Sequence, residues 1–115
     1  MNVNQMIEKV LVKVTSNIWP LVCPLEDKPD KYIVYNSELD EAAYFADDQE
    51  QEWIQNMQIH LYKRDDYMEE RKKIRRLLKS IGFTVTHIYS DYETSTKYYH
   101  LCFECHIEEE DFNGV

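Results

Sequence analysis

The order of hydrophobic and polar residues predicts two amphipathic helices. Residues 3–18 place apolar side chains on one face at three- and four-residue spacing, with Asn2 as a suitable N-cap and Pro20 just beyond the end. Residues 65–81 form a second apolar stripe, with acids in the first turns and basic residues after them, as the helix dipole favours. Gly82 is expected to end this second helix.

The predicted strands are short apolar runs or alternations of apolar and polar residues. They are, in order, 32–35, with or without a short strand at 42–46, then 53–62, 83–89 and 97–107. Residues 20–31 and 36–40 are a predicted loop and turn. The last two strands form a long β-hairpin around the polar connection 90–96. The expected core face of the final strand consists of Tyr99, Leu101, Phe103, Cys105 and Ile107.

The predicted element order is therefore α-β-(β)-β-α-β-β. Each helix must bury an apolar stripe, which favours an α+β fold with two helices packed on one face of a mostly antiparallel four- to five-stranded sheet. At 115 residues the chain is expected to form a single domain over 1–115. An acidic tail, 108–115, is expected to be flexible.

The net charge of −9 argues against nucleic acid and against anionic membranes as partners, because both recognise clustered cations. No apolar run approaches the ~18 residues of a membrane span, and the polar N-terminal segment does not have a signal-peptide pattern. The three cysteines, an odd number, are expected to be free thiols in a reducing cytosol.

No motif in the sequence predicts catalysis or a cofactor. The patterns G-x-S-x-G, G-x-G-x-x-G and Walker A are absent. Cys102 and Cys105 stand three residues apart on a predicted strand, so their side chains should lie on opposite faces and not share a metal. Alternate residues of the last predicted strand share one face, and a neighbouring strand can add His60 or His87. These residues either form a half-exposed polar surface or, as the alternative, a metal site: His100, Cys102, Glu104 and His106.

The charges are unevenly distributed. Eight of the thirteen cations lie between Lys63 and Lys79, and ten of the twenty-two acids lie within residues 26–52. This polarity predicts that a basic surface on one copy meets an acidic surface on the next copy or on a partner. The predicted basic surface consists of Arg71, Lys72, Arg75 and Arg76, and the acidic one of Asp47, Asp48 and Glu50. The alternative is a solvated helix face with pairs such as Glu69–Lys73.

Several segments together have the pattern of a known family. They are YIVYN (32–36), AYFADD (43–48), QIHLY (58–62), IGF (81–83) after the basic helix, Tyr89, and YETSTKYYHLCFE (92–104). In these segments, which cover most of residues 30–107, the chain resembles the small tail-terminator (tail-completion) proteins of long-tailed phages and prophages of low-GC Gram-positive bacteria.

The resemblance implies a structural protein and not an enzyme. Such proteins form a ring, commonly hexameric, that caps the finished tail tube and offers a surface to the head connector. The implied partners are further copies of the chain, the tail tube protein and the head–tail connector protein. The implied locations are the bacterial cytoplasm during assembly and the virion tail. The alternatives are another head–tail connector component, an acidic regulatory or inhibitor module, and a metal-dependent enzyme built on His100, Cys102 and His106.

Overall fold

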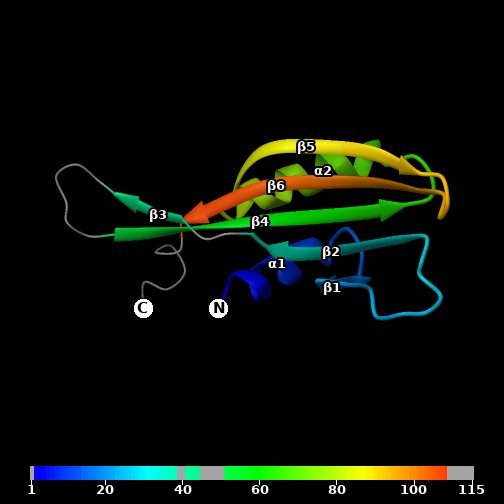
Figure 1. The fold of residues 1–115 in the computed structure, drawn as a ribbon, viewed down its shortest axis with the longest axis horizontal. Coiled ribbons are helices and arrows are strands. Elements are labelled where there is room, and N and C mark those ends of the chain that lie inside the picture. The colour runs from blue at the N-terminus through cyan, green and yellow to red at the C-terminus, as the bar shows by residue number, and fades with distance from the viewer. Residues whose placement is uncertain (1, 39–40, 45–50, 109–115) are drawn as a thin grey trace.

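A computed structural model describes residues 2–38, 41–44 and 51–108 (Figure 1). Its elements are α1 (Val3–Leu11), β1 (Ile18–Pro20), β2 (Lys31–Ser37), β3 (Glu41–Tyr44), β4 (Gln51–Lys63), α2 (Met68–Ser80), β5 (Thr84–Glu93) and β6 (Tyr98–Glu108). The predicted α+β class, with two helices and a mostly antiparallel sheet, is confirmed for the described part of the chain. The predicted tail lies outside the described residues beyond Glu108.

The strands form one sheet in the order β1-β2-β4-β6-β5, and β3 also pairs with β4. β1 and β2 are parallel, whereas the other pairings are antiparallel. β4 is the central strand. β6 pairs with one edge of β4, whereas β2 and β3 pair with different lengths of its other edge. Figure 1 shows the β3 end of β4 extending past the rest of the sheet.

Both helices pack on the same face of this sheet, as predicted. Ile7 and Leu11 of α1 and Ile74 and Leu78 of α2 are all 0% exposed within one hydrophobic cluster. The sheet contributes to this cluster mainly Ile33, Tyr35, Met57, Ile59, Leu61, Leu101, Phe103, Cys105 and Ile107. Burying each large apolar side chain stabilises the fold by about 1.5–3 kcal/mol. Tyr99 was expected in the core of β6 but is only half-buried, between the rings of Tyr67 and Tyr92.

The first helix is shorter than predicted. It ends at Leu11, and Ile18 begins β1, although residues 3–18 were expected to be helical. The physical reason lies in the polar residues between them. The Asn17 N–H donates to Thr15 Oγ1 at 3.1 Å, and Asn17 Nδ2 donates to the Lys31 carbonyl at 3.3 Å, bonds that compete with helix continuation. Ile18 still reaches the core, because it pairs with Ile33 of β2.

Several strand boundaries also differ from prediction. Asn36 and Ser37 were expected in a turn but extend β2, because Gln58 and Met57 of β4 supply their pairing partners. β5 continues to Glu93 instead of ending at 89, since β6 pairs with it up to Tyr98. The turn is therefore confined to residues 94–97. The short strand at 42–46 is present as β3, over Glu41–Tyr44. α2 begins at Met68 and not at 65. Trp53, near the start of β4, is 46% exposed.

Gly82 ends α2, as predicted, in a conformation that few other residues adopt. Its φ is +102°, and a Cβ built on it would lie 3.3 Å from Ile107 Cδ1 of β6. The N–H groups of Gly82 and Phe83 donate to the carbonyls of Lys79 and Leu78, so the last turn of α2 is closed. The glycine thus lets the chain reverse tightly from α2 into β5.

We therefore expect Gly82→Ala to lower the free energy of unfolding by about 1–2 kcal/mol, because an L side chain is strained at positive φ. Chemical denaturation monitored by circular dichroism measures this difference. Gly82→Asn is the matched variant: asparagine tolerates the left-handed region better, so its loss should be smaller. Equal stability of Gly82→Ala and the unmodified protein would contradict the role of the backbone conformation.

Candidate functional site

The predicted basic surface lies on the solvent side of α2. Ile74 and Leu78 turn into the core, which fixes the rotation of the helix. Positions one and four residues apart then share the outer side. Arg71 is half-buried, and Lys72, Arg75, Arg76 and Lys79 are exposed. The structure therefore brings the four predicted residues Arg71, Lys72, Arg75 and Arg76 together on one helix face.

The cations of this helix face are unpaired within the described part of the chain. None of Arg71, Lys72, Arg75, Arg76 and Lys79 takes part in an ion pair there. The alternative pair Glu69–Lys73 is not formed either: Lys73 Nζ instead donates to the Lys13 carbonyl at 2.7 Å and ties α2 to the segment after α1. Unpaired cations in a chain of net charge −9 leave a localised positive patch.

Other cations of the basic segment have structural partners. Lys63 Nζ lies 2.8 Å and Lys31 Nζ 3.3 Å from Glu70 Oε2. Burial of Glu70 disfavours its charged form, but the hydrogen bonds and charge of Lys63, with Lys31, outweigh this and lower the pKa of Glu70. Arg64 pairs with Asp30 at 2.9 Å and lies 4.4 Å from the centroid of the Tyr98 ring. The ion pairs of Glu70 hold the start of α2 to β2 and β4, and the Arg64–Asp30 pair joins the chain after β4 to the loop before β2.

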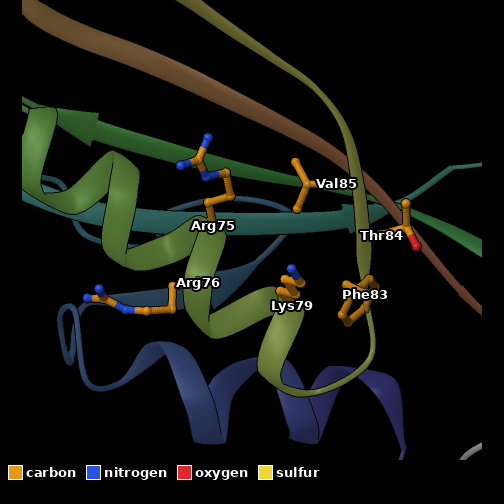
Figure 2. Close-up of a pocket in the computed structure, with 6 residues that line it drawn as sticks. All are labelled: Arg75, Arg76, Lys79, Phe83, Thr84 and Val85. Carbon is orange, nitrogen blue, oxygen red and sulfur yellow. The ribbon is translucent and has the colours of Figure 1, made fainter.

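A groove continues the positive patch toward β5. Six residues line it, three cations from α2 and three residues from the chain just after it: Arg75, Arg76, Lys79, Phe83, Thr84 and Val85. Figure 2 shows the cations on α2 and the other three on the strand that passes beside the helix. The volume of this basic groove is about 530 Å³. Its lining is partly apolar, because Phe83 and Val85 contribute to it. Phe83 is buried and Val85 is half-buried. The sequence indicated the cations of the groove but not its apolar lining, which depends on the chain reversal at Gly82.

The predicted acidic surface falls between β3 and β4 in the sequence. Asp47, Asp48 and Glu50 lie outside the described residues. The strands on either side of them, β3 and β4, are antiparallel partners, with Tyr44 opposite Gln51. The acidic surface consequently remains a prediction.

The helix-free face of the sheet carries the second candidate set. His100, Cys102, Glu104 and His106 alternate along β6 on this face and are half-buried. His60 Nδ1 lies 2.8 Å from His100 Nε2, and His60 Nε2 lies 3.1 Å from Asn36 Oδ1. Since the Asn36 oxygen accepts from His60 Nε2–H, the bare Nδ1 of His60 accepts from His100 Nε2–H.

This face holds a hydrogen-bonded network of neutral rings. Burial, reinforced by the neighbouring His100, lowers the pKa of His60 from 6.5 to about 4. Burial also lowers the pKa of His100, although Glu93 and Asp91 oppose this. His87 lies farther out, 3.7 Å from Glu104. Among the described residues, no group of three or more His, Cys, Asp or Glu side chains is arranged to hold a metal ion.

The cysteines lie where their spacing predicts. Cys105 is buried in the core beneath the helices, whereas Cys102 is half-buried on the opposite face. Burial raises the pKa of the Cys102 thiol to about 11 and that of Cys105 to about 12, with nearby charges adding to both. Thiols with raised pKa values are poor nucleophiles and poor metal ligands at neutral pH.

An aromatic cluster that the sequence did not reveal covers part of the same face. The rings of Tyr32 and Tyr62 stack at 4.8 Å, and Tyr98 meets both edge-on at 5.5 and 6.0 Å. Cys23 joins them from the loop between β1 and β2. Tyr98 Oη donates to the Pro29 carbonyl at 2.6 Å. These contacts hold the 21–30 loop against the sheet.

Comparison with known proteins identifies the fold. No family model matches this chain, and no curated protein matches it in sequence. The fold is similar to that of a chain in the solved structure of the virion of a native gene transfer agent (GTA) particle, with a TM-score of 0.61 and 8% sequence identity. The similarity covers 93% of this chain and 90% of that chain. Separately, no helix among the described residues is long and apolar enough to cross a membrane.

The buried histidine pair makes a prediction about pH. His60 has a pKa of about 4 when folded and an ordinary value of 6.5, so the unfolded chain binds its proton first. Its stabilising contribution is complete above about pH 6.5 and is lost as the pH falls toward 4, by roughly 1–2 kcal/mol after solvent screening. Denaturation at pH 7.5 and pH 5 should show a smaller loss for His60→Gln than for the unmodified protein. His87→Gln, at an exposed ring, is the control, and an equal pH dependence of all three proteins would contradict this account.

Proposed function

We propose that this protein is a non-enzymatic structural subunit of a phage-like virion, and more specifically a tail-terminator or tail-completion subunit. The observation that carries the proposal is the similarity of fold, over nearly the whole of both chains, to a chain of a gene transfer agent virion. The sequence resemblance described above adds the specific role. In that role the protein forms a ring that caps the tail tube and joins it to the head connector.

The mechanism is recognition between surfaces, with no bond made or broken. The basic surface of Arg71, Lys72, Arg75 and Arg76 meets the acidic surface of Asp47, Asp48 and Glu50 on the next copy. Because the two surfaces differ, the contact is head-to-tail, and such contacts close into a ring when the rotation between copies permits. The helix cations form no ion pair among the described residues, which supports this mechanism, since ions already neutralised within one chain would add little to assembly.

The remaining partners follow from the role. The ring binds the tail tube protein on one side and the head–tail connector protein on the other, without nucleic acid or membrane as a ligand. The subunit is made in the bacterial cytoplasm and ends in the virion tail. A ring subunit needs surfaces and not a catalytic centre, which agrees with thiols whose raised pKa values make them poor nucleophiles.

Reversing charge on the basic surface tests this function. Arg75→Glu with Arg76→Glu should block ring formation and incorporation into tails, because like charges would then face each other. We expect the protein concentration needed for half-assembly to rise about tenfold or more, measured by light scattering. Assembly of the unmodified protein should also loosen with salt, since about 0.15 M salt screens charges beyond ~8 Å.

The matched control is Lys9→Glu with Lys13→Glu, which makes the same change in net charge on α1 and just after it. Circular dichroism should show both variants folded, because all four side chains are exposed. Electron microscopy of tails from cells carrying each variant reports incorporation. Unchanged assembly of the α2 variant, or equal loss in both variants, would sink the electrostatic ring.

A further inference from the structure

The loop after β1 exposes an apolar patch with acids beside it. The side chains of Leu21, Val22 and Leu25 are 76%, 64% and 45% exposed. Glu26 and Asp27 follow directly and are exposed. Residues 21–27 are called the apolar–acidic loop below. Apolar side chains gathered on the surface and rimmed by charge are typical of protein interaction sites.

The apolar–acidic loop is held in one shape. The Leu21 N–H donates to the Tyr35 carbonyl at 2.8 Å, Cys23 is buried in the aromatic cluster, and Tyr98 Oη secures Pro29. Leu21 has a φ of +68°, a left-handed conformation that is unfavourable for leucine. A strained residue that keeps an apolar side chain in solvent is best explained by a partner, and a loop held in place loses little freedom on binding.

The basic groove has the complementary character. Phe83 and Val85 supply apolar wall, and Arg75, Arg76 and Lys79 supply charge that no acid neutralises in the described part of the chain. The apolar–acidic loop presents the matching pair of properties, three apolar side chains and two carboxylates. The loop and the groove therefore match in two respects, apolar contact and opposite charge.

The two surfaces lie at opposite edges of the sheet. The loop follows β1 and is bonded through the Leu21 N–H to the Tyr35 carbonyl of β2, whereas the groove contains Val85 of β5. Four strand spacings separate β1 from β5 in the order β1-β2-β4-β6-β5, about 19 Å. Figure 1 shows β5 along the upper edge of the sheet and β1 along the lower edge. One copy therefore does not fill its own groove, whereas a second copy can.

From this geometry we infer that the apolar–acidic loop of one copy docks in the basic groove of the next. Leu21, Val22 and Leu25 contact the apolar part of the groove at the half-buried Val85, while Glu26 and Asp27 face the cations Arg75, Arg76 and Lys79. The inference rests on the self-assembly proposed above and names a segment that provides it. Arg71 and Lys72, nearer the start of α2, meet only the acidic surface of Asp47, Asp48 and Glu50 proposed above, and Arg75 and Arg76, at the boundary, contact both segments.

Disulfide trapping between two full-length variants tests this contact. Leu25→Cys and Val85→Cys chains are mixed at high concentration under mild oxidation; Val85 points from β5 toward α2 (Figure 2). Linked dimers should form at least about tenfold faster in the mixture than with either variant alone, because the contact brings unlike positions together. Ser90→Cys replaces Val85→Cys in the control mixture; Ser90 is exposed on the same strand but about 16 Å from Val85. Each variant alone also measures any reaction of the native cysteines.

Each outcome decides the inference. Leu25→Cys chains that link to one another would indicate a symmetric contact and overturn it, and so would linking no faster than in the Ser90→Cys control. Leu21→Ser with Val22→Ser should weaken self-association about tenfold while the fold is kept, and undiminished association would count against it. Electron microscopy of tails tests the proposed function separately. Selective disulfide linking without incorporation of the protein into tails refutes only the virion role, and incorporation without selective linking refutes only this contact.

Discussion

The burial of two helix stripes against one face of the β2–β4–β6 sheet is the constraint on which the rest of this structure depends. Ile7 and Leu11 fix α1, and Ile74 and Leu78 fix α2, on strands whose central inward side chains, such as Ile33, Ile59 and Phe103, are fully buried. Once these residues are inside, the rotation of α2 is determined and its cations must face solvent. The reversal at Gly82 then places the start of β5 beside the helix, which completes the basic groove.

The same burial explains how much of the fold could be predicted. The periodicity of three and four residues correctly identified which side chains of 3–18 face the core, including Ile18. It could not identify where the helix ends, because Ile18 reaches the core equally well from a short strand. The bonds of Asn17 to Thr15 and Lys31 decide that point, and the second of them joins residues fourteen apart in sequence. Parallel pairing of a three-residue strand is a tertiary event that local pattern does not indicate.

The candidate site was predictable in its charges and not in its shape. Counting cations located the basic segment. Only the structure separates Lys63, Arg64 and Lys73, which have partners within the chain, from Arg75 and Arg76, which form no ion pair with any described residue. Phe83 and Val85 became part of a groove through the tight turn, and the His60–His100 pair depends on strand register. Exposure of Leu21 and Leu25 is likewise a property of the folded loop, since leucine in a sequence ordinarily indicates core.

A subunit of net charge −9 that assembles with itself must overcome repulsion between its copies. A local positive patch can orient two copies head-to-tail, but long-range repulsion between whole subunits still opposes the contact. Apolar area offsets this repulsion because its contribution does not depend on salt and acts only at close range. A groove that combines Phe83 and Val85 with three cations therefore has the composition that such an assembly needs: the charges select the orientation, and the apolar contact holds it.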